Sequence, residues 1–212
     1  LLDIISVKVL LMKKAQELKK KYQLARDKLF DTLIINNDGV QFNNNHTLLV
    51  DQIVKELVEE IQNQFPVTNF SLIAVGGYGR QDLSPKSDVD LLFLYQKSNK
   101  NIRDFITQLN NSLWDLGLEV GISFLTLKQA IIDSKKDIKT VTKFAESRHL
   151  IGDEDYYGEF VRSIKILIGK LNSLKLSEKK LLELVGRHDY YLGIKSTLEP
   201  QIKEGIGGLR DI

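Results

Sequence analysis

The chain has 212 residues, enough to bury a sizeable core and to form one or two compact units. Its 30 Lys and Arg residues nearly balance its 28 Asp and Glu residues, and the formal net charge of +2 does not favour binding to nucleic acid. The chain contains no Cys, which excludes a disulfide framework and a thiolate metal site and is consistent with a reducing, cytoplasmic location.

The N-terminal residues do not predict a membrane segment. The apolar run over residues 1–11 is interrupted by Asp3 and Lys8. It is also shorter than the roughly 20 residues that a membrane-spanning helix needs. We interpret it as the start of an amphipathic helix. Because the chain does not begin with Met, we expect it to be a segment of a longer protein.

Helices are predicted before the first strand. Apolar residues recur at spacings of three and four over residues 4–35, which predicts one long helix or two. The Asn-Asn-Asp-Gly sequence at 36–39 breaks this pattern, and the three Asn residues at 43–45 predict another loop. A further helix is predicted over residues 48–65, and Pro66 ends it.

The middle of the chain predicts a small sheet. Residues 70–75 and 89–95 are apolar runs, and the second is apolar on both faces, as expected of a central buried strand. A helix is predicted over residues 101–116, ending at Gly117, and a third strand is predicted over residues 118–125. The order strand, strand, helix, strand favours an α+β core.

The C-terminal part of the chain is predicted to be helical. Helical periodicity begins at Leu127 and continues to about Ile194, with breaks near Gly152-Asp153 and Asn172-Ser173. The predicted fold class is therefore α+β, with a small mixed β-sheet core between two helical segments. We expect three parts: a helical segment over 1–66, a core over 67–128 and a helical segment over 129–212.

Two aspartates begin the second predicted strand. Asp88 and Asp90 are separated by one residue, and side chains at such positions of a strand point to the same side. Two adjacent carboxylates repel each other unless a cation lies between them. Mg²⁺, or Mn²⁺, held by both carboxylates and by substrate phosphates is the expected occupant. Asp88 and Asp90 are therefore predicted metal ligands and catalytic residues.

A glycine turn precedes the aspartates. Gly76 and Gly77 follow the first strand and would let backbone N–H groups approach a phosphate closely. Arg80 could add positive charge, or be an ordinary loop arginine, and Ser87 could donate to a phosphate oxygen or cap a turn. Either motif alone is weak, but together they predict a metal-dependent nucleotidyl-transfer site.

Four strings carry a resemblance to a known family. Residues 75–80 read Val-Gly-Gly-Tyr-Gly-Arg, and residues 83–92 read Leu-Ser-Pro-Lys-Ser-Asp-Val-Asp-Leu-Leu. Residues 113–121 read Leu-Trp-Asp-Leu-Gly-Leu-Glu-Val-Gly, and residues 198–212 read Leu-Glu-Pro-Gln-Ile-Lys-Glu-Gly-Ile-Gly-Gly-Leu-Arg-Asp-Ile. Gly-Gly followed by Asp-x-Asp resembles the signature of DNA polymerase β-like nucleotidyltransferases. The longer strings resemble bacterial PII uridylyltransferase/uridylyl-removing enzymes, over nearly the whole chain.

The resemblance implies a specific reaction. A tyrosine hydroxyl of the PII nitrogen-regulatory protein would attack the α-phosphate of UTP, so that UMP is transferred and pyrophosphate leaves. Nucleic acid and membranes are not expected partners. Members of the superfamily usually add a third carboxylate from a neighbouring strand, and Glu119 is the nearest candidate here. A solvent-exposed Glu at a strand edge is the alternative interpretation.

The C-terminal glycine-rich string is part of the same resemblance. It implies that Lys203 and Arg210 lie near the nucleotide or pair with carboxylates. His188-Asp189 invites a metal-phosphohydrolase interpretation, but with only 3 His in the chain a pair on a helix surface is more plausible. The family's uridylyl-removing His-Asp domain and its ACT domains would lie beyond the residues present here.

One departure from the family pattern keeps alternatives open. Residues 122–126 read Ile-Ser-Phe-Leu-Thr where the family usually has His-Ser-x-Arg-Thr, so a His and an Arg are missing. A related transferase with another nucleotide or acceptor, such as an adenylyltransferase of glutamine synthetase or a small-molecule nucleotidyltransferase, is one alternative. A non-catalytic nucleotide-binding regulatory module is the other.

Overall fold

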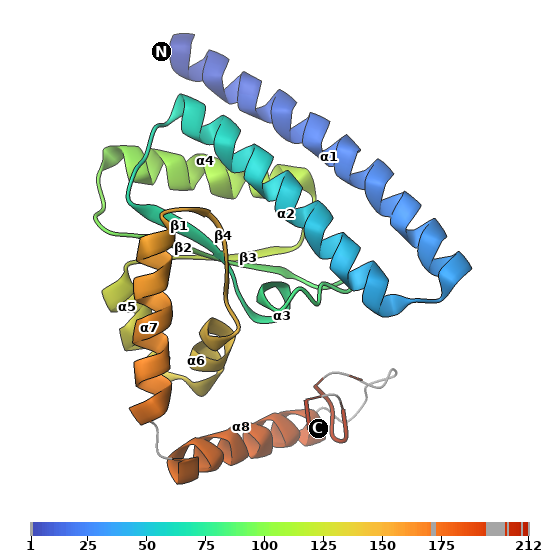
Figure 1. The fold of residues 1–212 in the computed structure, drawn as a ribbon, viewed down its shortest axis with the longest axis vertical. Helices are drawn as coiled ribbons and strands as arrows, with labels where there is room; N and C mark the ends of the chain where they lie inside the picture. Colours follow the sequence, from blue (N-terminus) through green and yellow to red (C-terminus); the bar gives the residue numbers. More distant parts are fainter. Residues whose placement is uncertain (1, 171–172, 194–201, 203, 209, 212) are drawn as a thin grey trace. The chain divides into compact units, whose positions relative to one another are not determined.

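The computed structural model describes residues 2–170, 173–193, 202, 204–208, 210 and 211 (Figure 1). The chain divides into two compact units, Leu1–Lys165 and Ile166–Ile212. Lys203, one of the predicted nucleotide-binding residues, lies outside the described residues.

A mixed sheet forms the centre of the first unit. Its four strands follow the order β3-β2-β1-β4, in which β1 is antiparallel to both neighbours and β2 is parallel to β3. The strands are β1 (Phe70–Ala74), β2 (Val89–Tyr95), β3 (Val120–Leu125) and β4 (Arg148–Gly152). The α+β class with a small mixed sheet is thereby confirmed, and β2 is an inner strand, as its apolar faces predict.

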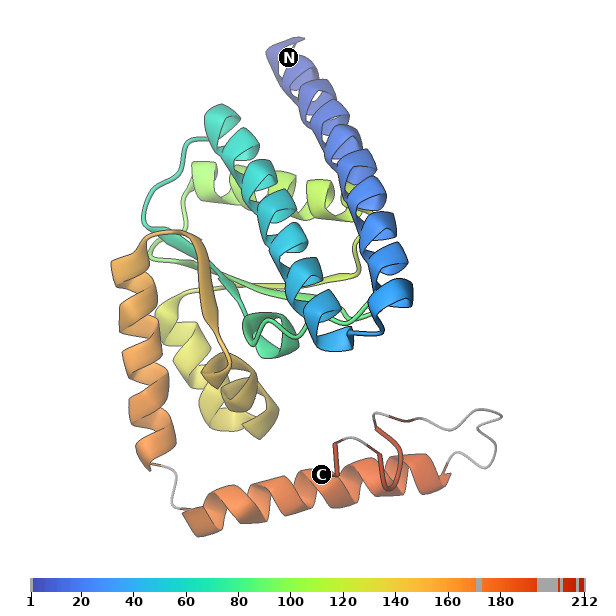
Figure 2. The same cartoon turned by 45° about the vertical axis from the view of Figure 1, so that its right-hand side comes forward.

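Helices cover both faces of this sheet (Figures 1 and 2). One face carries α1 (Leu2–Asn36), α2 (Gly39–Gln64) and α4 (Lys100–Leu116). The other carries α5 (Leu127–Lys136), α6 (Ile138–Ala145) and the first turns of α7 (Glu154–Lys170). The remaining helices are α3 (Gly76–Gly79), between β1 and β2, and α8 (Ser173–Gly193), in the second unit.

Aromatic and aliphatic side chains fill the space between the sheet and α4. Phe70 of β1 and Phe93 of β2 stack at 5.0 Å between ring centroids, and Phe105 of α4 lies 5.5 Å from both rings. Offset aromatic packing of this kind adds to the hydrophobic gain of burial. The helix α4 ends as predicted at Gly117, which adopts the left-handed conformation (φ 75°) that favours glycine.

The second helix begins earlier than the sequence predicts. Asp38 caps α2 by accepting a hydrogen bond from the Gln41 N–H at 2.9 Å, so the helix begins at Gly39 and includes Asn43, Asn44 and Asn45. The predicted loop over 43–45 is therefore wrong. Asn has a modest helix propensity, but the buried Phe42 and His46 on the inner face fix this turn against the core.

The strand β4 is also missing from the sequence-based prediction, which makes residues 127–194 helical apart from breaks. It is only five residues long, and its place in the sheet depends on antiparallel pairing with β1, far away in the sequence. The break expected near Gly152 is present, because Gly152 has φ 103° and an added Cβ would lie 2.4 Å from the Phe70 carbonyl oxygen. None of the helices in the described part of the chain combines the length and the hydropathy that a membrane-spanning helix requires.

Candidate active site

The glycine turn and the aspartates meet where β1 ends and β2 begins. The Val75 N–H donates to the Asp90 C=O at 3.1 Å and so extends the β1–β2 pairing by one step. Residues 76–79 then form a single helical turn, α3, rather than an open loop. The N–H groups in the first turn of a helix have no partner within the helix and can donate to another group.

The two aspartates differ in exposure. Asp88 precedes β2 and is exposed, while Asp90 is the second residue of the strand and its side chain is 33% exposed. An added Cβ on Gly76 would lie 3.6 Å from Asp90 Oδ2, so the turn passes directly beside this carboxylate. Gly76 itself has φ 62°, a backbone conformation that residues other than glycine rarely adopt.

Asp90 has a basic partner that the sequence analysis does not identify. Lys143 of α6 places its Nζ 2.7 Å from Asp90 Oδ1. The two residues are 53 positions apart in the chain. No motif of the sequence points to Lys143, because a single Lys on an amphipathic helix looks like an ordinary surface residue.

The third strand leaves room for Asp90. Gly121 of β3 pairs with Asp90 across the parallel ladder, and an added Cβ there would lie 2.9 Å from Asp90 Oδ1. Glu119 directly precedes β3 and is exposed, and its C=O accepts from the Val89 N–H at 2.7 Å. Since Val89 pairs with Val120, Glu119 is the neighbour of Asp88 in register. Its role as a third carboxylate stays a prediction.

Arg80 and Ser87 flank the same turn. Arg80 follows α3 and its guanidinium pairs with the Glu146 carboxylate just after α6. The Ser87 side chain is exposed, and its backbone N–H donates to the Ser84 C=O at 3.0 Å, which closes a turn. Both residues therefore lie on the segment between α3 and β2, and their predicted contacts with phosphate stay predictions.

The donor set suits a divalent cation that arrives with a substrate. Among the described residues, no three His, Asp or Glu side chains gather into a ready-made metal site. Mg²⁺, however, is commonly held by one or two carboxylates together with substrate phosphates. Asp90 and the nearby Asp88 supply such oxygens, and neither Gly76 nor Gly121 places a side chain of its own beside the Asp90 carboxylate.

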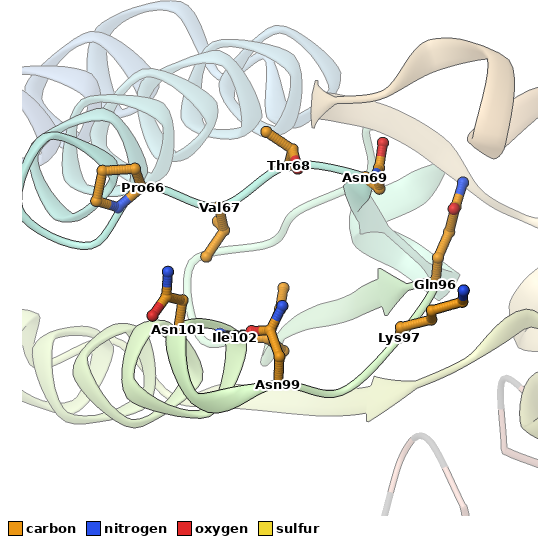
Figure 3. A pocket seen from close by; sticks show the side chains of 9 residues that line it. All are labelled: Pro66, Val67, Thr68, Asn69, Gln96, Lys97, Asn99, Asn101 and Ile102. Atoms are coloured by element: carbon orange, nitrogen blue, oxygen red, sulfur yellow. Dashed lines mark hydrogen bonds between the residues drawn. The ribbon is translucent and has the colours of Figure 1, made fainter.

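A separate hollow lies at the other end of the same strands (Figure 3). It has a volume of about 340 Å³, and Asn69, Gln96 and Asn99 are among the residues that line it. Asn69 precedes β1 and Gln96 follows β2, whereas Asp88 and Asp90 lie where β2 begins. This hollow is therefore not part of the candidate active site.

The second unit holds the C-terminal glycine-rich string against α8. Asp211 accepts from His188 Nε2 at 2.8 Å and from the Gly207 N–H at 2.7 Å, and it pairs with Arg187 at 2.8 Å. We call these contacts the C-terminal clasp. Arg210 pairs with Glu204 at 2.7 Å within the same string. His188 and Asp189 both lie on α8, as the interpretation of a pair on a helix surface expects, and His188 bonds to Asp211 of the C-terminal string.

The C-terminal clasp is expected to open in acid. Burial raises the pKa of Asp211, but the Gly207 N–H, His188 and Arg187 together hold it below the ordinary value. A carboxyl group whose pKa is lowered by folding stabilises the folded state above its unfolded pKa of about 3.9, and this contribution is lost as the pH falls further. We expect the Gly207 amide to lose protection against hydrogen exchange, after correction for intrinsic exchange rates, when the pH is lowered below about 4.

Two variants test this assignment. Asp211→Asn should lose the protection of the Gly207 amide already at neutral pH, because the amide side chain carries no charge for Arg187. Asp189→Asn, an exposed neighbour of His188, should keep the wild-type profile. Equal protection of the Gly207 amide in the wild type and in Asp211→Asn at neutral pH would contradict the proposed role of Asp211.

Comparisons with known proteins identify the family of the chain. Residues 54–150 match the family model described as "Nucleotidyltransferase domain", and residues 175–212 match the one described as "GlnD PII-uridylyltransferase". A bifunctional uridylyltransferase/uridylyl-removing enzyme of Erythrobacter litoralis is 32% identical over 92% of this chain and 22% of its own length. The enzymes of the same name from Ralstonia nicotianae and Idiomarina loihiensis are 34% and 37% identical over 79% and 76% of this chain, and 20% and 18% of their own lengths.

The mixed sheet and the match over residues 54–150 identify this part of the chain as a nucleotidyltransferase domain. Within that class, the chain belongs to the PII-uridylyltransferase family, as the resemblance of its motifs implies. The chain spans about a fifth of the length of these relatives. A crystal structure of a toxin–antitoxin with AMP-PNP also aligns with 61% of the chain and 95% of its own, but at a TM-score of 0.34 and 17% identity this likeness is too weak to support any inference.

Proposed function

We propose that this chain transfers UMP from UTP to a tyrosine of a PII signal-transduction protein, in the cytoplasm and with Mg²⁺ or Mn²⁺. The tyrosine oxygen forms a bond to the α-phosphorus, the bond from that phosphorus to the bridging oxygen breaks, and pyrophosphate leaves. The tyrosine proton passes to solvent or to a nearby carboxylate. The observation that carries the proposal is the Asp90 carboxylate directly beside the Gly76 backbone.

Different residues of the site are proposed to bind the cation and the nucleotide. Asp88 and Asp90 would hold the cation, which when bound would neutralise phosphate charge and orient the attacking hydroxyl. The Gly76 and Gly77 backbone would hold the triphosphate through N–H groups of the first turn of α3. Arg80, Ser87, Lys203 and Arg210 are proposed to add contacts to the nucleotide, and Glu119 a further carboxylate.

The two alternatives are a transferase that uses another nucleotide and a module that binds nucleotide without transferring it. The missing His and Arg at residues 122–126 favour a module that binds nucleotide without transferring it. Two exposed or partly exposed carboxylates at the start of a strand and beside a glycine turn favour catalysis, because two such charges repel each other unless a cation lies between them. The matches to uridylyltransferases favour UTP over ATP.

The proposal is tested by incubating the chain with purified PII protein, Mg²⁺ and UTP labelled at the α-phosphate. We expect label on PII from UTP and much less from equally labelled ATP. Label from ATP alone would favour the adenylyltransferase alternative. Binding of UTP with Mg²⁺ but no label on PII, even after long incubation, would favour the non-catalytic module.

A further inference from the structure

Lys143 is a charged residue beside the site to which neither the motifs nor the proposed reaction gives a role. Its Nζ lies 2.7 Å from Asp90 Oδ1, and the side chains of Lys143 and Asp90 are 35% and 33% exposed. At such exposure, an ion pair contributes little to folding stability. A contact of this kind placed on a predicted metal ligand calls for a functional explanation.

The stem of Lys143 also lies against the glycine turn. An added Cβ on Gly76 would be 3.7 Å from Lys143 Cγ and 3.6 Å from Asp90 Oδ2. Lys143 therefore borders both the predicted metal ligand and the predicted phosphate-binding backbone. A lysine ammonium is a compact charge on a long flexible stem, well suited to binding phosphate.

Packing fixes the helix that carries Lys143. Gly79 lacks a side chain where the Glu146 carbonyl comes close, and Arg80 pairs with the Glu146 carboxylate. At the other end of α6, Asp137 caps the helix by accepting from the Lys139 and Thr140 N–H groups. The position of Lys143 beside the turn thus follows from contacts on both sides of it.

We propose that Lys143 is an exchangeable cation of this site. Without nucleotide, its ammonium neutralises Asp90 and competes with a divalent cation for the carboxylate. When a nucleoside triphosphate and its cation bind, Lys143 leaves Asp90 and pairs with the phosphate groups at the Gly76–Gly77 turn. Because the ligand is a nucleoside triphosphate with a divalent cation, this inference rests on the proposed function.

The test measures binding of Mn²⁺ to the nucleotide-free chain by electron paramagnetic resonance. Lys143→Met removes the competing charge and should tighten Mn²⁺ binding about two- to fivefold, the range expected for a partly exposed ion pair. The same variant should weaken binding of UTP in the presence of Mg²⁺ about tenfold or more, because a charged contact to phosphate is lost. Lys143→Arg should retain most of the UTP affinity.

Two further variants separate the possible failures. Lys135→Met removes an exposed charge from α5 and should change neither constant. Asp90→Asn should weaken binding of Mn²⁺ both alone and together with UTP, and if it weakens neither, the metal site of the proposed function is wrong. If Asp90→Asn weakens Mn²⁺ binding while Lys143→Met leaves both the Mn²⁺ and the UTP constants at wild-type values, the exchange by Lys143 alone is overturned.

Discussion

Replacing Asp88 and Asp90 together by Asn is expected to lower the rate of UMP transfer to PII by more than about 100-fold. Loss of a residue that only supports a metal ligand already lowers metal affinity or activity by about 10- to 100-fold, and here both ligands are changed. Both carboxylates would lose the negative charge that holds a divalent cation. Asn keeps the size of each side chain, so the space beside Gly76 and Gly121 stays filled as before. The effect is therefore assigned to charge rather than to packing.

The double variant is expected to fold like the wild type. Asp88 is exposed, and the Asp90 pair with Lys143 is about one third exposed, so its loss should change the free energy of unfolding by about 1 kcal/mol or less. Thermal unfolding followed by circular dichroism checks this. Asp115→Asn, an exposed carboxylate at the end of α4, is the control that should keep both activity and melting temperature. Transfer by the double variant at the wild-type rate would overturn the site.

The sheet core and the aspartates are predictable because their determinants are local. The apolar run over 89–95 specifies an inner strand, and it coincides with β2 as the structure has it. The spacing of Asp88 and Asp90 and the turn at Gly76–Gly77 lie within one short segment, so their proximity follows from chain connectivity. Gly117 likewise ends α4 through a conformation that belongs to that single residue.

The features that escape the sequence depend on partners far along the chain. The strand β4 is defined by its pairing with β1, and the helical conformation of residues 43–45 depends on the burial of Phe42 and His46 against the core rather than on Asn propensity. Both ring nitrogens of His46 have partners, Tyr22 Oη at 2.9 Å and the Leu83 C=O at 3.0 Å. Lys143 approaches Asp90 only because α6 packs beside the glycine turn.

Gly79→Ala is expected to destabilise the first unit strongly. An added Cβ would lie 1.9 Å from the Glu146 carbonyl oxygen and 3.0 Å from that of Ala74, so backbone at the end of α6 or of β1 has to move. Overpacking typically lowers the free energy of unfolding by about 1–3 kcal/mol and occasionally by more. Because the added Cβ would meet backbone atoms, we expect a loss of about 3 kcal/mol here. For a chain of this length, that corresponds to a fall in melting temperature of about 6–12 °C.

Gly77→Ala is the matched control, two residues earlier in the same helical turn. Its added Cβ would meet no atom closer than 3.6 Å, the Asp82 carbonyl oxygen, which is an ordinary van der Waals contact. We expect its free energy of unfolding to stay within about 0.5 kcal/mol of the wild type. Because Gly79 holds α6 against the turn, Gly79→Ala should also displace Lys143 from Asp90, whereas Gly77→Ala should not. Equal melting temperatures for the two variants would mean that α3 and the end of α6 do not pack this closely in solution.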